Sequence, residues 1–294
     1  MTYVKRKILT KLAGLAIFFA AVFIILQASR HQLATSPVAA AAQEGIELPV
    51  LLYHSILPGT SNANKYSLTP ELFESDMRYL KEHGYEAVLS SDLIAYASCQ
   101  GDLPQKPVLI TFDDGYYNNY LYALPILESY DMKAIISIIG APAEQFSLVE
   151  DLTPSYSYLN WEQINELRAT GIIEIGNHTY HLHTQSKGRC GVNRVSGESL
   201  GAHREALFAD VGGLQAAFST HCGFEPVAFA YPFGRRDEES HEVLKELGFL
   251  VTLTSYERLN TITRDPKCLY NLGRFNRPGG KSTAEYMLNA LGVP

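Results

Sequence analysis

From residue 48 onward, the chain alternates short, continuous apolar runs with amphipathic segments that carry helix signals. The runs are too apolar for strands with one wet face, which is typical of a parallel sheet covered by helices. The sequence therefore predicts an α/β fold, with a distorted (β/α) barrel favoured over an open sheet. The expected strands are 49–53, 86–89, 108–112, 133–139, 172–176, 227–231, 249–254 and 270–274.

Helix-start and helix-stop residues bound the segments between these strands. Thr69 and Pro70 form an N-cap and a first-turn proline, and Gly84 lies just past the expected end of that helix. A long helical region at 199–221 is expected to be interrupted at Gly212 and Gly213. Further helices are expected at 91–97, 121–130, 161–170, 238–247 and 282–291.

The first thirty residues predict an export signal. Lys5, Arg6 and Lys7 precede an uncharged apolar run at 12–26, so the basic end is expected to stay in the cytoplasm while the rest of the chain is exported. The length of the run suits either a signal peptide or an uncleaved membrane anchor at 1–30, and an uncleaved anchor keeps the N-terminus cytoplasmic. We therefore expect an extracytoplasmic protein, secreted or anchored in the membrane.

Composition suggests the remaining boundaries. Residues 31–47 are rich in Ala and Ser without an apolar period, which predicts a flexible linker. Residues 48–294 are enough to bury the core of a single α/β domain. The net charge of −7 argues against a nucleic-acid partner, and no protein partner is predicted. Four cysteines allow disulfides in an exported protein, in three pairings that the sequence leaves open.

One expected strand delivers two adjacent carboxylates to its C-terminal end. The apolar run 108–112 is followed by Asp113, Asp114 and Gly115. Neighbouring carboxylates repel each other, and a bound cation or a shared proton is the usual way to offset the repulsion. Taken alone, however, Asp-Asp-Gly is better explained as a turn.

A second polar cluster changes that balance. His178, His181 and His183 follow the apolar strand 172–176 within six residues. A lone histidine is more often an ordinary surface or core residue, but three after a buried strand, in a chain with an unexplained carboxylate pair, favour a metal site. One carboxylate with two imidazoles is a common ligand set that leaves positions open for water and substrate.

We assign Asp114, His178 and His183 as ligands of a divalent metal ion. Asp113 is then free to take a proton from a water on the metal, whose pKa the metal lowers to about 7, whereas His181 has no required role. Zinc is the expected ion, with cobalt, nickel or iron as alternatives, because this ligand set discriminates weakly between metals.

Other polar and aromatic residues follow expected strands at the same face. In parallel barrels, functional groups lie where the strands end, and His54, Tyr231, Phe233 and Arg274 all fall there. We expect Tyr231, Phe233 and Arg274 to contact the substrate. A structural ion pair is the alternative for Arg274.

These residues resemble the motifs of the polysaccharide deacetylase (NodB-like, carbohydrate esterase) family. The segment 111–115, Thr-Phe-Asp-Asp-Gly, is similar to its first motif, and His178-Thr179 is similar to the start of its second. The resemblance implies that 48–294 is a catalytic domain with the distorted barrel of that family. The spacing from His178 to His183, and the segment 49–55, resemble the branch that deacetylates poly-β-1,6-N-acetylglucosamine.

The chain also departs from the commoner family pattern. The third motif, at 230–234, lacks the arginine that would orient the catalytic aspartate, and Arg274 is a candidate to replace it. The late motif of leucine and histidine is missing from 272–277. In the exopolysaccharide branch, a histidine of the first strand is thought to act as the general acid, and the resemblance implies this role for His54.

The resemblance thus implies a metal-dependent hydrolase that releases acetate from an N-acetylated polysaccharide. Asp113 is expected to deprotonate the attacking water and His54 to protonate the departing amine. Peptidoglycan and chitooligosaccharides are the alternative substrates, because the sequence does not reveal the shape of the groove. A non-catalytic surface protein that binds carbohydrate is the alternative from another class, although a pure binder has no need of the base Asp113.

Overall fold

The computed structural model describes residues 45–59, 63–186 and 188–292, which form one compact unit beginning at Gly45. The unit starts before the predicted boundary at 48 because β1 (Ile46–Leu48) pairs with β13 (Asn260–Ile262). The predicted export signal lies outside the described residues. Within those residues, no helix combines the length and the apolarity that a membrane crossing needs.

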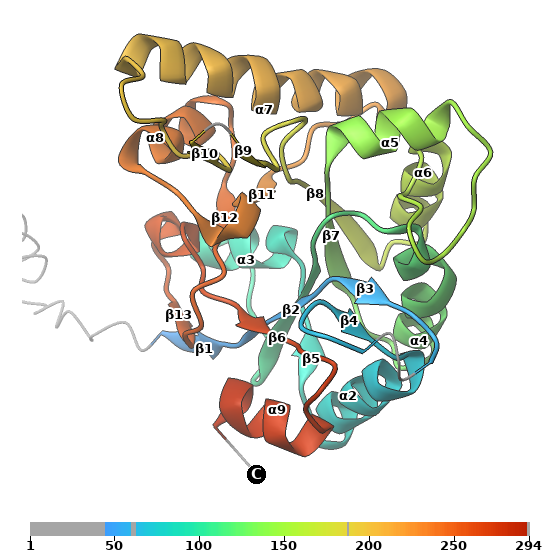
Figure 1. Cartoon of the computed structure of the whole chain (residues 1–294). Coiled ribbons are helices and arrows are strands. Elements are labelled where there is room, and N and C mark those ends of the chain that lie inside the picture. Colours follow the sequence, from blue (N-terminus) through green and yellow to red (C-terminus); the bar gives the residue numbers. More distant parts are fainter. Residues whose placement is uncertain (1–44, 60–62, 187, 293–294) are drawn as a thin grey trace, which may run out of the picture. The chain divides into compact units, whose positions relative to one another are not determined.

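The centre of the unit is a curled, eight-stranded parallel sheet, shown in Figure 1. Its order is β12–β11–β8–β7–β6–β2–β14, and β5 pairs with the start of β6. A parallel bridge between Leu253 and Leu272 joins β12 to the residues that precede β14, so the sheet is a partial barrel. Its strands are β2 (Val50–Tyr53), β5 (Glu86–Ala87), β6 (Pro107–Phe112), β7 (Ala134–Ile138), β8 (Ile173–Asn177), β11 (Ala228–Ala230), β12 (Val251–Leu253) and β14 (Phe275–Asn276).

Helices surround this sheet, as the sequence predicts (Figure 1). Thr69 caps α2 through its side chain and Pro70 opens that helix, both as expected. The α-helices are α2 (Pro70–Glu82), α3 (Ser90–Ala97), α4 (Leu124–Ser129), α5 (Gly140–Ser147), α6 (Trp161–Ala169), α7 (Leu200–Cys222), α8 (Glu238–Glu246) and α9 (Thr283–Leu291). Short π- and 3-10-helical turns are η2 (Asn119–Ala123), η3 (Pro232–Gly234) and η4 (Pro266–Leu269).

Alternate residues of the strands point to two different apolar clusters. Ile110 and Ile136 belong to the outer cluster, which the surrounding helices cover. Leu109 and Ile135 belong to the inner cluster, to which α3 contributes Leu93. Because both faces are buried, the strands read as continuous apolar runs in the sequence.

The small strand pairs lie at the margins of this sheet. The pair β3 (Ser55–Ile56) and β4 (Ser67–Leu68) is parallel, and the pair β9 (Gln185–Ser186) and β10 (Arg189–Cys190) is antiparallel. All four cysteines of the chain lie in described segments and are unpaired: Cys99, Cys190, Cys222 and Cys268.

Besides the short strands outside the main sheet, three elements differ from the sequence-based expectations. The predicted interruption at Gly212 and Gly213 is wrong, because α7 is continuous and buries Val211 and Leu214 on either side of the glycines. The predicted strand 270–274 is also wrong: Leu272 makes one bridge, and β14 begins only at Phe275. Helix α5 was not expected from the sequence.

Candidate metal centre and active-site cleft

The predicted catalytic and metal-binding residues converge on a cleft of about 800 Å³ at the C-terminal end of the sheet. His54 follows β2, Asp113 and Asp114 follow β6, and His178 and His183 follow β8. These strands are near neighbours in a parallel sheet, so their carboxyl ends meet at the same edge. The structure therefore brings together five residues that are up to 129 positions apart in the sequence.

Asp114, His178 and His183 form the candidate metal centre. One ligand atom from each lies within 4.8 Å of the others, and the Oδ1 atom of Asp114 is 3.6 Å from His178 Nε2 and 3.4 Å from His183 Nε2. His178 Nδ1 donates to the carbonyl of Ala230 at 2.7 Å, which leaves the lone pair on Nε2 directed at the centre. A hard carboxylate oxygen and two imidazole nitrogens suit a divalent cation.

Burial keeps both histidines in the form that binds a metal. It lowers the pKa of His178 to about 3 and lowers the pKa of His183 as well, so both rings are neutral near pH 7. Burial, together with the neighbouring Asp113, raises the pKa of Asp114 to about 6. A cation between these three groups removes that penalty, because it favours the ionised carboxylate.

The turns that follow β6 and β8 each contain a non-glycine residue with a positive φ, which is a rare conformation. Asp114 has φ 73° and Thr179 has φ 73°, and such strain is concentrated at functional sites. Gly115 has φ +76°, and a Cβ there would lie 2.9 Å from Ile138 Cδ1. The turn after β6 therefore requires glycine at this position of the first motif.

Arg274 holds Asp113 from across the curled sheet. Its NH1 and NH2 atoms donate to Oδ1 and Oδ2 of Asp113, each at 2.7 Å, and its Nε donates to the carbonyl of Thr254. Burial raises the pKa of Asp113, but the Arg274 guanidinium lowers it by more, so the pKa lies well below its usual range. Asp113 therefore stays ionised, in a fixed orientation, 3.9 Å from His178 Nε2.

Of the three residues expected to contact substrate, only Phe233 lines the cleft. Arg274 is 1% exposed and its donors face Asp113, so it has no free donor for a substrate. It forms the ion pair that was the alternative prediction, on the aspartate that the missing arginine was expected to orient. Tyr231 is fully buried with Phe229 in the cluster beneath α7 and α8. Side chains alternate along a strand, so Tyr231 points to the same side of β11 as Phe229, away from the barrel interior. The expected substrate contact is therefore wrong for Tyr231 too.

The sequence did not reveal three residues that support the site. Tyr116 lines the cleft together with Asp114. Tyr158 packs against the Tyr116 ring, with centroids 4.9 Å apart. Asp210 of α7 accepts hydrogen bonds from the backbone N–H groups of Tyr180 and His181, which fixes the loop between the two histidine ligands. Tyr116 adjoins the first motif, whereas no local pattern marks Asp210.

The fold and the site define a partial α/β barrel with a candidate Asp-His-His metal centre at the C-terminal edge of its sheet. The family model for polysaccharide deacetylase matches residues 100–252, a range that contains every candidate metal ligand. The chain belongs to the polysaccharide deacetylase family.

Individual relatives agree with this assignment. The chain is 30% identical to YxkH of Bacillus subtilis (strain 168) over 210 residues, which cover 71% of this chain and 64% of YxkH. It is 25% identical to the poly-beta-1,6-N-acetyl-D-glucosamine N-deacetylase of Escherichia coli (strain K12) over 215 residues, which cover 67% of this chain and 32% of that protein. The chain thus spans about two thirds of the first relative and about one third of the second.

A solved structure shows the same fold. The de-N-acetylase from Aggregatibacter actinomycetemcomitans superposes with a TM-score of 0.70 at 22% identity, covering 81% of this chain and 98% of that one. The partial barrel described above is therefore the fold of a structurally characterised group.

Proposed function

We propose that this protein is a metal-dependent polysaccharide N-deacetylase that removes acetyl groups from N-acetylglucosamine units. The observation that carries the proposal is the pairing of two features in one cleft. One is the set of Asp114, His178 and His183, which suits a divalent cation, and the other is a neighbouring carboxylate, Asp113, which Arg274 keeps ionised. A binding protein has no need of the base Asp113.

The residues of the chain divide the reaction among them. A divalent cation, when bound, supplies a Lewis acid and lowers the pKa of water in the cleft. Asp113 accepts a proton from that water, whose oxygen adds to the acetyl carbon. The bond from carbon to nitrogen then breaks, and His54, which lines the same cleft, protonates the departing amine. Acetate and a glucosamine unit are the products.

We propose poly-β-1,6-N-acetylglucosamine as the polymer and zinc as the metal. The relative from Escherichia coli, whose name gives that substrate, supports the first assignment. Tyr66, Tyr116 and Phe233 line the cleft with the candidate metal ligands, and aromatic rings in such a position suit the apolar faces of sugar rings. Cobalt, nickel and iron are alternative metals for the same ligands.

We further propose that the protein acts outside the cytoplasm, with residues 1–30 as its signal peptide or membrane anchor. The basic residues before an uncharged apolar run support this location. Fractionation of cells that express the full chain, followed by detection of its C-terminus, tests it. Recovery of the protein from the cytoplasm alone would contradict it.

Acetate release is the decisive measurement. The full chain is incubated with poly-β-1,6-N-acetylglucosamine or with peptidoglycan, with and without a chelator and added zinc. We expect release from the first polymer, loss of release with chelator, and recovery with metal. Release from peptidoglycan alone would keep the chemistry and overturn the substrate, whereas metal binding without release from either polymer would favour a binding protein.

His178→Ala should abolish metal binding and activity together, because it removes a buried ligand whose orientation the Ala230 carbonyl fixes. His181→Ala is the matched control, since His181 is exposed and does not belong to the set of candidate ligands. Metal content is measured by elemental analysis. A fully metal-loaded His178→Ala protein would refute the ligand assignment.

A further inference from the structure

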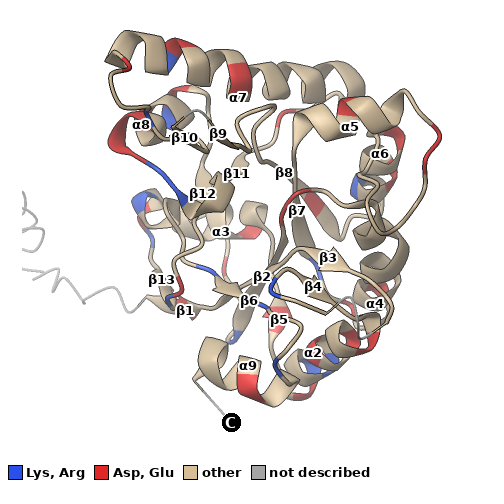
Figure 2. Cartoon of the chain, in the orientation of Figure 1, with Lys and Arg blue, Asp and Glu red and all other residues tan. Residues whose placement is uncertain are grey.

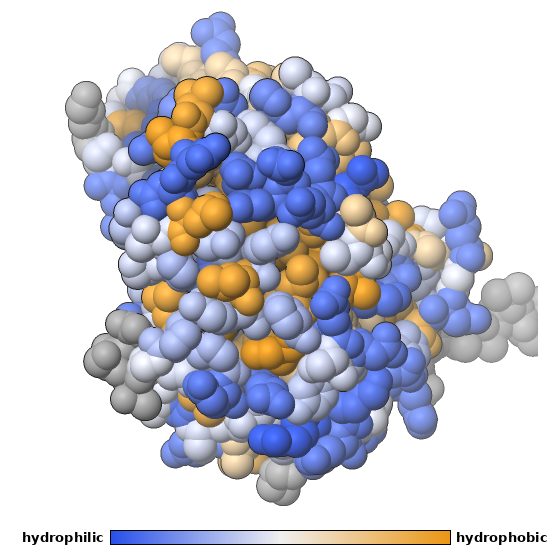
Figure 3. All heavy atoms as spheres, turned by 90° about the vertical axis from the view of Figure 1, so that its right-hand side faces the viewer, coloured by the Kyte–Doolittle hydropathy of each residue, from blue (hydrophilic) through white to orange (hydrophobic). Residues whose placement is uncertain are grey.

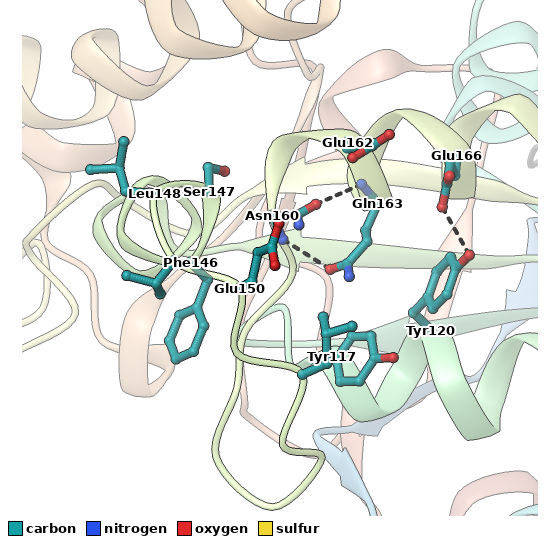
Figure 4. Close-up of a pocket in the computed structure, with 12 residues that line it drawn as sticks. Tyr117, Tyr120, Phe146, Ser147, Leu148, Glu150, Asn160, Glu162, Gln163 and Glu166 are labelled. Carbon is teal, nitrogen blue, oxygen red and sulfur yellow. Dashed lines mark hydrogen bonds between the residues drawn. The ribbon is translucent and has the colours of Figure 1, made fainter.

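A second cavity, of about 900 Å³, lies beside α5 and α6 and has no role in the site described above. Figure 4 shows its walls, which come from the start of η2, the end of α5, the loop that follows α5, and α6. Tyr117 and Tyr120 stack with their ring centroids 6.1 Å apart and line one side, and Phe146 lines another. Rings of this kind offer flat apolar surfaces to a sugar.

All the charged residues that line this cavity are acidic. Glu150, Glu162 and Glu166 line it, and none of its lining residues is a lysine or an arginine. Figure 2 shows acidic residues on α5, on α6 and in the loop between them. Within the described part of the chain, Glu150 and Glu162 form no ion pair, whereas Glu166 accepts a hydrogen bond from the Tyr120 hydroxyl. The cavity is therefore suited to a cationic ligand.

A buried polar group is aimed into the same space. Gln163 is 8% exposed, and its Oε1 atom accepts a hydrogen bond from the backbone N–H of Asn160 at the start of α6. Gln163 lines the cavity, and in Figure 4 its Nε2 group has no hydrogen-bonded partner among the residues drawn. This amide donor is open to solvent and is free to donate to an oxygen atom of a bound ligand, such as a sugar oxygen.

Aromatic rings connect this cavity with the catalytic cleft. Tyr116 lines the cleft, and Tyr117, the next residue, lines the second cavity. The ring of Tyr158 packs on Tyr116 at 4.9 Å and on Phe146 at 5.9 Å, and all three rings are partly exposed. The face of the molecule that carries α5 and α6 shows apolar patches among hydrophilic residues (Figure 3). Through these rings the second cavity adjoins the catalytic cleft.

We propose that the second cavity is a glycan subsite for de-N-acetylated units, which carry an ammonium group in place of the acetamide. This inference rests on the proposed function, because the reaction in the cleft produces that ammonium group. Glu150 and Glu162 pair with the ammonium, the partly exposed Tyr120 and Phe146 rings accept the sugar, and Gln163 Nε2 donates to a sugar oxygen. The subsite retains the product end of the polymer beside the metal centre.

The test measures binding without turnover. The full chain carrying Asp113→Asn is titrated by calorimetry with a β-1,6-linked glucosamine pentamer and, separately, with the fully N-acetylated pentamer. We expect Glu150→Gln with Glu162→Gln to weaken binding of the glucosamine pentamer about 3- to 10-fold, as two partly exposed ion pairs would. Binding of the acetylated pentamer should stay within about 2-fold, and only the glucosamine pentamer should weaken with added salt.

The matched control removes the same charge elsewhere. Glu205 on α7 and Glu225 after it are exposed and form no ion pair with described residues, so Glu205→Gln with Glu225→Gln should leave both affinities unchanged. Equal affinities in the cavity variant and the control, or an equal loss for both pentamers, would overturn the subsite. Acetate release by the unmodified chain tests the proposed function separately, so either proposal can fail alone.

Discussion

Arg274 and Arg277 stand on either side of β14, and each is buried against an aspartate from much earlier in the chain. Arg274 points toward the cleft and holds Asp113 after β6. Arg277 points toward the outer helices and holds Asp76 of α2 through Nε at 2.7 Å and NH2 at 3.1 Å. The two pairs are alike in residue type, burial and geometry, yet only the first lies at the candidate active site.

The difference lies in what else each carboxylate accepts. An ionised carboxylate has about four lone-pair sites. Asp76 fills them with two donors from Arg277, the Tyr53 hydroxyl and the Thr283 hydroxyl. Among the described side chains, only Arg274 donates hydrogen bonds to Asp113, one to each carboxylate oxygen. A saturated carboxylate stabilises the fold, whereas a carboxylate with free lone pairs at a cleft can accept a proton.

Asp113→Asn provides the largest test of that contrast. An amide cannot act as a general base, so kcat should fall about 10²- to 10⁴-fold, while metal content stays at the level of the parent protein because Asp113 is not in the ligand set. Acetate release and elemental analysis measure the two effects. If the variant loses its metal, Asp113 is a ligand and the contrast with Asp76 fails.

Asp76→Asn should have the opposite profile. It leaves Arg277 buried without a counter-charge, which typically costs about 3–5 kcal/mol of unfolding free energy. Activity per folded molecule should stay within about 2-fold, because Asp76 is fully buried and lies outside the cleft. Urea unfolding and kinetics on the folded fraction report the two quantities. A folded Asp76→Asn protein as inactive as Asp113→Asn would break the comparison.

Replacing each arginine by lysine should separate the roles of the two ion pairs more finely. Lysine keeps the charge but loses the two-pronged contact, so Arg274→Lys should lower kcat about 10- to 100-fold through misplacement of Asp113, as is typical of groups that orient an active-site residue. Arg277→Lys should lower stability while leaving kcat unchanged. Steady-state kinetics on the two proteins side by side decide the matter, and equal kcat values would count against an orienting role for Arg274.

Glu174 offers a smaller test, because it is a largely buried carboxylate without a guanidinium. It accepts hydrogen bonds from the Ser90 hydroxyl and the Ser91 N–H at the start of α3, and burial raises its pKa to about 7. A raised pKa gives stability that is complete below the unfolded value and disappears as the pH rises through about 7. Relative to Glu174→Gln, the parent protein should lose about 2 kcal/mol between pH 5 and pH 8.

Urea unfolding of both proteins across this pH range isolates the contribution of Glu174, since every other titrating group is common to them. Identical pH profiles would mean that Glu174 stays ionised in the fold. Burial alone would then not be enough to raise the pKa of a carboxylate in this sheet, and Asp113 would not need Arg274 in order to stay ionised.

Much of the fold could be predicted from the sequence because its signals are local. The run 108–112 became β6, and Thr69 with Pro70 began α2 as expected. The break expected at Gly212 did not occur, since burial of Val211 and Leu214 outweighs the cost of about 1 kcal/mol for each glycine in a helix. Local propensity yields to packing where a helix is held along its whole length.

The candidate site was predictable only in part. Histidine spacing identified His178 and His183, because both follow one strand end. The resemblance suggested Arg274 as the residue that orients Asp113, but no local pattern in the sequence pairs the two, because 161 positions separate them. Tyr231 was misassigned because its alternation in β11 sets it against Phe229 and away from the cleft. Contacts across the sheet and the direction of a side chain after a short strand leave no local trace.

The long separation between Asp113 and Arg274 also bears on the order in which the protein matures during synthesis. All three candidate metal ligands lie within the first 183 residues, whereas the guanidinium that fixes Asp113 comes 91 residues after the last of them. Pairings between distant parts of a chain form slowly, and β14 must reach β2 from the far end. A nascent or clipped polypeptide that ends before residue 274 therefore contains all three candidate ligands but lacks the guanidinium that orients Asp113, so hydrolysis depends on the segment that contains Arg274.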